Sequence, residues 1–279
     1  MSQIEIWQAA VLGVVEGITE FLPISSTGHL TISEQLMGLD IKDPAITGYT
    51  AVIQMGAIAA ALIYFFKDIL RLAGAWIRGL FSSSARQESD YRLAWYVIFG
   101  SIPVGVVGFL AQDYIKGGLR SLWVVAGALI LWSLPMAFAE HAATQIKDER
   151  GLTFKDSLII GFTQCLSLIP GVSRSGATIT AGLLRDLDRV TATRLSFFLG
   201  IPALTAAGAY ELKDALGGAA VSTTTLAIGT IVSFVVAYVS IAWLLRFVAH
   251  HTLLTFVWYR VLLGAAIIGL LVTGTIQAY

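Results

Sequence analysis

Apolar residues fill six long stretches of the chain, and polar residues gather between them. A helix needs about 20 mostly apolar residues to cross the hydrocarbon core of a bilayer. The pattern therefore predicts six membrane-spanning helices. The stretches cover residues 46–66, 93–111, 121–139, 195–212, 222–245 and 256–277.

Two further apolar segments are interrupted before they reach spanning length. Residues 6–38 contain a break at Pro23, and residues 156–184 contain one at Pro170 and Gly171. Pro and Gly end helices, and irregular backbone survives at membrane depth only where protein buries it or where it lines a wet cavity. We predict that both segments are re-entrant helical hairpins.

Composition supports a membrane protein and narrows the possible partners. The chain is 56% hydrophobic and 13% charged, whereas soluble domains are about 25% charged. A formal net charge of +0 gives no reason to expect a nucleic-acid partner, and a single cysteine excludes an intramolecular disulfide. Because Lys42 is the first basic residue, the first apolar segment is expected to stay in the mature protein.

Basic residues divide unevenly between the two faces that this topology defines. The division holds only if each hairpin returns to the face from which it starts. The positive-inside rule then places the richer face in the cytoplasm and both termini outside. Twelve basic residues are predicted to lie in loops on the richer face: Lys67, Arg71, Arg78, Arg86, Arg92, Lys147, Arg150, Lys155, Arg185, Arg189, Arg194 and Arg246. Four belong to the other: Lys42, Lys116, Arg120 and Lys213.

An internal repeat relates the two interrupted segments. A shift of 148 residues aligns several positions around the breaks: Gly13 with Gly161, Glu16 with Gln164, Ser25 with Ser173, Thr27 with Ser175 and Gly28 with Gly176. Because the hairpins are expected to enter from opposite faces, this indicates an inverted-topology repeat, as in many transporters. The alternative is a chance likeness between helices rich in Gly and Ser. We predict an all-α polytopic membrane protein with one domain, 1–279, and repeats at about 1–139 and 150–279.

Two carboxylates precede the first break. Glu16 and Glu20 are four residues apart, so a helix places them on one face. They repel each other unless one is protonated or a cation lies between them, and Mg²⁺ and Ca²⁺ prefer such oxygen ligands. The alternative is a neutral hydrogen-bonded pair, but intramembrane carboxylates are rare without a function.

Hydroxyl groups and a histidine follow the first break. One of Ser25, Ser26 and Thr27 is expected to cap the next helix, and the same helix end can bind a phosphate. His29 is three residues after Ser26, so imidazole and hydroxyl can meet on one face. This arrangement favours general acid–base work by His29 on a nucleophile.

The second break carries a lone arginine. Arg174 presents a forked set of donors that suits phosphate oxygens, and small polar residues flank it. The alternative is an ion pair between Arg174 and Glu16 or Glu20. Thr178 is as readily a helical threonine bonded to its own backbone as a ligand.

Two motifs together resemble those of a known family. Glu16-Gly-Ile-Thr-Glu-Phe-Leu-Pro-Ile-Ser-Ser-Thr-Gly-His29 and Pro170-Gly-Val-Ser-Arg-Ser-Gly-Ala-Thr178 resemble the bacterial undecaprenyl-diphosphate phosphatase (bacitracin-resistance) family, and the likeness covers essentially the whole chain. The resemblance implies a metal-dependent phosphatase of the inner membrane that acts on the C55 isoprenyl diphosphate carrier of cell-wall synthesis. It also implies a site open to the periplasmic side.

The expected site combines both motifs. Glu16 and Glu20 would hold Mg²⁺ or Ca²⁺ against the diphosphate. The expected catalytic residues are Ser26, or a water in its place, with His29, Glu20 and Arg174. The expected substrate-binding residues are Ser25, Thr27, Gly28, Ser173, Ser175, Gly176 and Thr178.

Two other classes of function compete with the phosphatase. Inverted repeats with broken helices are typical of transporters, so a flippase for polyprenyl phosphate or another anion is the alternative. A purely structural membrane scaffold would leave Arg174 and both carboxylates without a purpose. The sequence leaves open which divalent ion is bound, whether lipid is also flipped and whether the chain forms a homodimer.

Overall fold

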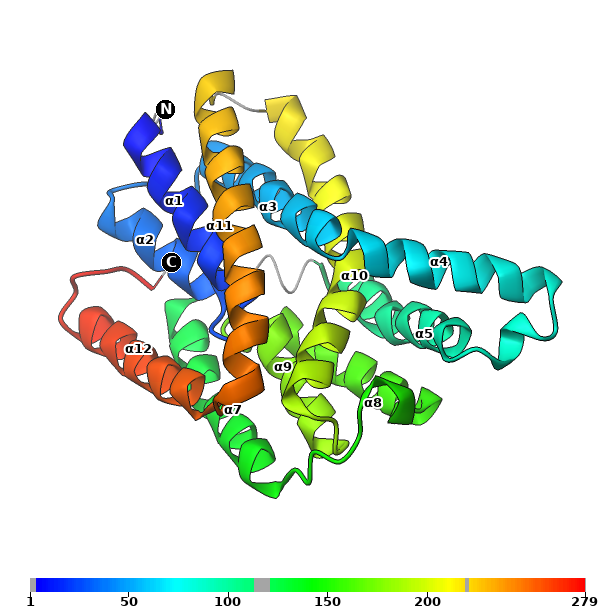
Figure 1. The fold of residues 1–279 in the computed structure, drawn as a ribbon. Coiled ribbons are helices and arrows are strands. Elements are labelled where there is room, and N and C mark those ends of the chain that lie inside the picture. The colour runs from blue at the N-terminus through cyan, green and yellow to red at the C-terminus, as the bar shows by residue number, and fades with distance from the viewer. Residues whose placement is uncertain (1–3, 113–120, 219–220, 279) are drawn as a thin grey trace.

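A computed structural model describes residues 4–112, 121–218 and 221–278 (Figure 1). These residues form helices, turns and loops, and six of the helices are long and apolar enough to cross a membrane. They match the six predicted stretches in order, with ends that differ by a few residues, and so confirm the prediction. The six are α3 (Pro44–Tyr64), α5 (Ser89–Leu110), α7 (Leu122–Ala142), α10 (Arg189–Gly218), α11 (Thr223–His250) and α12 (Leu254–Val272).

Polar side chains fix where several long helices begin. The side chains of Asp43, Ser121 and Ser222 accept hydrogen bonds from backbone N–H groups in the first turns of α3, α7 and α11. Such caps satisfy donors that have no partner inside the helix. In α3 the first helical residue is Pro44, which has no N–H to satisfy and a φ already suited to a helix.

The first interrupted segment folds as a hairpin of two short helices. These are α1 (Ile6–Thr19) and α2 (Ser26–Leu36). At 1.5 Å per residue, a helix as short as α2 covers roughly half of the hydrocarbon core. Gln8 near the start of α1 donates a hydrogen bond of 3.2 Å to the carbonyl of Met37 just after α2. The hairpin therefore returns to the face from which it starts.

The second interrupted segment has the same form. Helix α8 (Phe154–Gln164) and a short 3₁₀ helix, η4 (Cys165–Leu168), lead to the break, and α9 (Arg174–Leu184) follows it. Nε of Arg185, just after α9, donates a hydrogen bond of 2.7 Å to Oδ1 of Asp156 near the start of α8. This hairpin also returns to its own starting face, so both predicted hairpins are confirmed.

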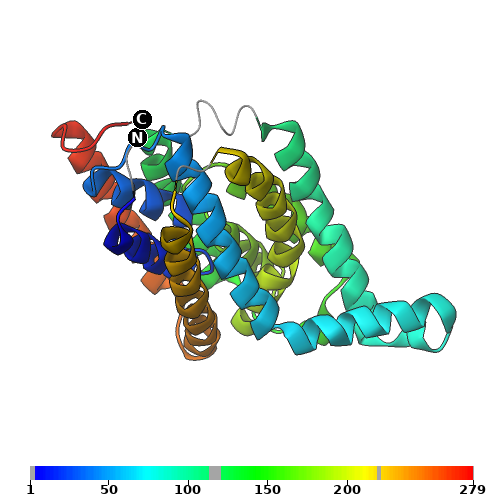
Figure 2. The ribbon, with the colours of Figure 1, turned by 90° about the horizontal axis from the view of Figure 1, so that it is seen from above.

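The two hairpins reach the centre of the protein from opposite faces. Gln35 at the end of α2 bonds the backbone of Gln277 near the C-terminus, and both termini lie on one side in Figure 2. Beyond α9, Asp186 bonds the backbone of Lys147 in a basic loop. The breaks themselves meet, because Ser175 donates a hydrogen bond to the carbonyl of Leu22. This is the inverted arrangement that the fold prediction required, whereas the repeat limits 1–139 and 150–279 stay a prediction.

Glycines let the first helix of each hairpin pack against a long helix of the other half. A Cβ added at Gly13 of α1 would lie 2.6 Å from the carbonyl oxygen of Gly229 in α11. A Cβ added at Gly161 of α8 would lie 2.2 Å from the carbonyl oxygen of Gly100 in α5. Backbones can approach this closely only where side chains are absent. The close packing at Gly13 of α1 therefore recurs at Gly161 of α8.

Ion pairs join the basic loops on one face. Arg71 contacts Asp90 at the start of α5 and Glu149, and Arg194 near the start of α10 contacts Glu149, so three segments far apart in the sequence meet there. One prediction about this face was wrong: residues 66–81 form a helix, α4 (Phe66–Phe81), where a loop was expected. Its charged residues are too frequent for a span, but one side of the helix is apolar and packs on α5. Lys116 and Arg120, predicted for the opposite face, lie outside the described residues.

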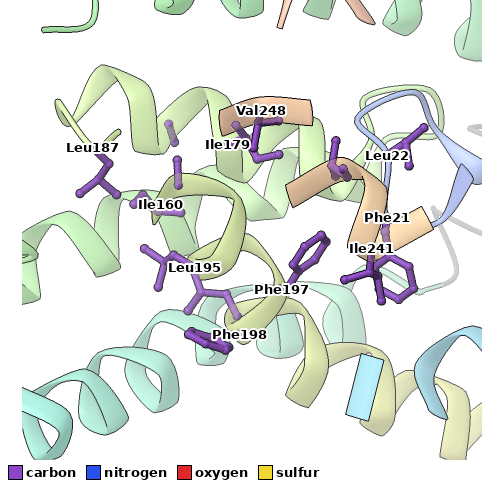
Figure 3. Packing of buried hydrophobic residues seen from close by; sticks show 14 of the residues in the cluster. Phe21, Leu22, Ile160, Ile179, Leu187, Leu195, Phe197, Phe198, Ile241 and Val248 are labelled. Atoms are coloured by element: carbon purple, nitrogen blue, oxygen red, sulfur yellow. The ribbon is translucent and has the colours of Figure 1, made fainter. Parts of the chain in front are cut away.

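An aromatic contact packs the chain at the first break against two long helices. Phe21 packs edge-to-face on Phe197 of α10 with ring centroids 5.5 Å apart, and Figure 3 shows these rings beside Ile241 of α11. All three side chains are buried. The backbone that turns at the first break is thus anchored on two long helices, which position the polar groups described below.

We expect Gly161→Ala to destabilise the protein, because the new methyl group would collide with the backbone of α5. Overpacking of this kind costs about 1–3 kcal/mol, and thermal unfolding in detergent measures it. Gly127→Ala is the matched control, since a Cβ at this helical position meets nothing within 4 Å. Equal melting temperatures for the two variants would contradict the packing described here.

Candidate active site at the two helix breaks

Glu20 joins polar groups from both breaks. Its Oε2 accepts a hydrogen bond of 2.8 Å from Oγ of Ser26. Its Oε1 forms an ion pair with Nη2 of Arg174 at 3.4 Å. Two residues that are 154 positions apart in the sequence therefore meet, and the alternative of an Arg174–Glu20 ion pair is realised in this state. Both side chains are largely buried, where an unpaired charge would be costly.

Arg174 lies in a space that neighbouring residues leave open for it. Nη1 donates to the carbonyl of Ser196 in α10 at 3.2 Å, and the guanidinium lies over the ring of Phe21. A Cβ at Gly200 would come within 1.9 Å of Nη1, so any side chain there would displace the arginine. Nε is buried without a hydrogen-bond partner among the described residues. The guanidinium thus has a donor left for a ligand.

The two short helices after the breaks begin differently. Ser25 and Ser173 hold the same unusual backbone conformation, with φ of 74° and 73°. Ser173 caps its helix, because its Oγ accepts from N–H of Gly176 at 3.2 Å. Ser25 makes no such side-chain bond, so this member of the three predicted candidates, Ser25, Ser26 and Thr27, does not cap the helix. The first N–H groups of α2 therefore stay available to an anion.

His29 does not bond to Ser26 in this structure. Its Nδ1 donates to the carbonyl of Ser25 at 2.7 Å. Its Nε2 lies 2.7 Å from the hydroxyl of Tyr259 in α12, and the two rings stack. The hydroxyl of Ser26 is instead directed to Glu20, so Glu20 is the base within reach of it. No local sequence pattern indicates Tyr259, because its pairing with His29 spans 230 positions.

Several predicted substrate-binding residues make contacts within the fold. Ser175 is fully buried and bonds the carbonyl of Leu22. Thr178 bonds its own helix at Arg174 and the hydroxyl of Ser196, so the alternative of a back-bonded helical threonine describes it. Their predicted role with substrate stays a prediction.

The remaining predicted binding residues lie around the start of α2 and α9. Thr27 is exposed. Gly28 faces α7, where a Cβ would lie 2.9 Å from Val125. Gly176 lies close to the side chain of Ser173, and a Cβ there would also approach a guanidinium nitrogen of Arg260 at 3.7 Å. Because Gly28 and Gly176 have no side chain, the starts of α2 and α9 can lie close to their neighbours.

Glu16 is the one predicted metal ligand with an unused oxygen. Its side chain is buried, and Oε1 has no hydrogen-bond partner among the residues described. No set of three or more His, Cys, Asp or Glu side chains is grouped for a metal ion within the described ranges. Mg²⁺, however, is often held by one or two carboxylates together with substrate phosphates. Glu16 and Glu20 fit that kind of site.

Sequence reasoning missed the residue that ties the two breaks together. Arg260 of α12 is fully buried. It donates to the carbonyl of Pro23 at 3.2 Å and to the carbonyl of Gly171 at 2.9 Å. Further bonds reach Ala128 and Ser133 of α7. The sequence feature that could have identified Arg260 is its place as the single basic residue within the apolar stretch 256–277.

The fold and this site define a class of protein: an all-α polytopic membrane protein whose two helix breaks form a buried centre of opposite charges. Comparison with known proteins gives the family. A family model described as "Bacitracin resistance protein BacA" matches residues 9–266, and the chain belongs to this family.

Curated relatives match along nearly the entire chain. The "Undecaprenyl-diphosphatase 1" of Streptomyces coelicolor is 57% identical over 279 residues and is covered completely, as is this chain. The "Undecaprenyl-diphosphatase" of Acidothermus cellulolyticus is 55% identical over 270 residues, which cover 97% of this chain and 98% of the relative. That of Cutibacterium acnes is 52% identical, with 97% and 98% covered.

We expect Arg260→Met to destabilise the protein by about 2–4 kcal/mol, because it leaves the buried carbonyls of Pro23 and Gly171 without their donor. Thermal unfolding in detergent measures the loss. Arg246→Met, at an exposed position of α11, is the control and should melt like the wild type. An unchanged melting temperature for Arg260→Met would show that the two breaks do not depend on this residue.

Proposed function

We propose that this protein is an undecaprenyl-diphosphatase, which hydrolyses C55 isoprenyl diphosphate to undecaprenyl phosphate and inorganic phosphate. The observation that carries the proposal is the contact of Glu20 with both Ser26 and Arg174. This contact brings together a candidate nucleophile (Ser26), a carboxylate (Glu20) and a cation that can bind an anion (Arg174). The names and the full-length similarity of the relatives support the same activity.

The terminal phosphoryl group would bind between the start of α2 and Arg174. The N–H groups of the first turn of α2 have no serine cap, and a helix start attracts phosphate through its N–H groups and its dipole. Arg174 supplies a forked donor and a permanent positive charge. Charge that develops on the equatorial oxygens during phosphoryl transfer would be stabilised by these groups.

The hydroxyl of Ser26 is the proposed nucleophile. Its proton passes to Glu20, which already accepts its hydrogen bond. Oγ forms a bond to the terminal phosphorus while the bond from phosphorus to the bridging oxygen breaks, and the lipid monophosphate leaves. Water then hydrolyses the phosphoserine and releases inorganic phosphate. In the alternative version, a water attacks directly and His29 handles its proton.

A divalent cation, Mg²⁺ or Ca²⁺, would be held by Glu16 and Glu20. The free oxygen of Glu16 supports this part of the proposal. When bound, the ion would neutralise diphosphate charge and polarise the phosphoryl oxygens.

The site is proposed to open to the periplasmic side of the bacterial inner membrane. The hairpin that carries Ser26 and His29 starts and ends on the face of the termini, whereas the ion-paired basic loops lie on the opposite face. The positive-inside rule places the basic face in the cytoplasm.

The purified protein in detergent should release phosphate from C55 isoprenyl diphosphate, and a chelator should stop the release. Added Mg²⁺ or Ca²⁺ should restore it. This assay also separates the phosphatase from the flippase, which the opposed broken helices favour as a second candidate. A flippase without phosphatase activity would release no phosphate under any of these conditions.

Substitutions at the proposed centre should lower turnover without loss of folded protein. We expect Ser26→Ala to reduce kcat by more than about 100-fold if Ser26 is the nucleophile. Arg174→Lys should reduce kcat by about 100-fold, because the forked donor is lost. Ser33→Ala, on the same helix, is the control and should turn over normally. Full turnover by Ser26→Ala would remove the covalent version and leave direct attack by water.

A further inference from the structure

The contact between His29 and Tyr259 has no part in the reaction as described so far. It joins α2 to α12 across 230 positions of the sequence. The hydroxyl of Tyr259 lies 2.7 Å from Nε2, and the rings are nearly parallel, at 3°, with centroids 5.6 Å apart. A hydrogen bond and a ring contact together fix both the direction and the plane of the imidazole.

These contacts also determine which nitrogen of the neutral imidazole carries the proton. The partner of Nδ1 is the carbonyl oxygen of Ser25 at 2.7 Å, and a carbonyl can only accept. Nδ1 therefore carries the hydrogen, and Nε2 presents its lone pair to the hydroxyl of Tyr259. The nitrogen that can take up a proton is the one that Tyr259 holds.

The neighbouring residue fixes Tyr259 relative to the breaks. Arg260 is bonded to the carbonyls of Pro23 and Gly171, and these bonds join α12 at this level to both breaks. Tyr259 is consequently presented to His29 from a point tied to both hairpins. A residue used only to fill space would need neither the hydrogen bond nor the fixed backbone.

We propose that Tyr259 is a positioning residue that holds the neutral imidazole of His29 with Nδ1 protonated and with the lone pair of Nε2 directed to the Tyr259 hydroxyl. The proposal rests on the version of the proposed function in which water attacks directly and Nε2 of His29 takes up its proton in place of the hydrogen bond from Tyr259. Tyr259 itself touches neither the carboxylates nor Arg174 through any hydrogen bond in the described residues. It acts through His29 alone, and this predicts that its effect disappears when His29 is replaced.

The pairing is tested first by a measurement that does not need activity. Nitrogen NMR of histidine-labelled protein in detergent resolves the tautomer, and His29→Gln assigns the signal among the four histidines. We expect the Nδ1–H tautomer for His29 and a shifted Nε2 signal in Tyr259→Phe. Tyr238→Phe, on α11, is the matched control and should leave the signal unchanged. An Nε2–H tautomer, or an unshifted signal in Tyr259→Phe, would overturn the proposal.

The role in turnover is tested by a double-mutant cycle of Tyr259→Phe with His29→Gln. In the wild-type background Tyr259→Phe should lower kcat about tenfold through loss of orientation, with KM changed less than about twofold and normal thermal unfolding. In the His29→Gln background it should have no further effect. An equal loss of kcat in both backgrounds would overturn the proposal. If the wild type released no phosphate, the proposed function would fail, while the NMR result would still support or overturn the pairing.

Discussion

A helix that breaks at membrane depth exposes backbone carbonyls and N–H groups that lipid cannot satisfy, and this constraint shapes the centre of the protein. Arg260 satisfies carbonyls at both breaks, because its one guanidinium donates hydrogen bonds to the carbonyls of Pro23 and Gly171. Ser175 adds a bond from the second break to the carbonyl of Leu22 in the first. The two hairpins are therefore joined through the groups that would otherwise be unsatisfied, and Glu20 and Arg174 are brought together as a result.

The two short helices differ in how the N–H groups of their first turns are satisfied, and this difference distinguishes the two sides of the site. Ser173 uses its own hydroxyl to cap the second short helix, whereas Ser25 leaves the first one uncapped despite the same backbone conformation. Under the proposed function, the two hairpins therefore have separate roles. One copy offers a free helix start with Ser26, and the other contributes the cation, Arg174.

Sequence was sufficient for most of the fold, whereas the roles of the predicted site residues stay a prediction. Apolar stretches of spanning length and the interruptions at Pro23 and Pro170 gave the six long helices and both hairpins, because these features depend on local chain properties. Contacts between residues far apart in the sequence could not be predicted in this way. The contacts of Tyr259 with His29 and of Arg260 with both breaks depend on how α12 packs, which no local pattern encodes. Helix α4 was missed because the positive-inside argument treats any basic segment as a loop.

The most direct test of the account is an experimental structure with a non-hydrolysable C55 diphosphate analogue and a divalent cation. The account predicts the terminal phosphoryl group at the uncapped start of α2, within hydrogen-bonding distance of Arg174 and Ser26, with the cation on Glu16 and Glu20. A phosphoryl group bound at the start of α9, or away from both breaks, would contradict it.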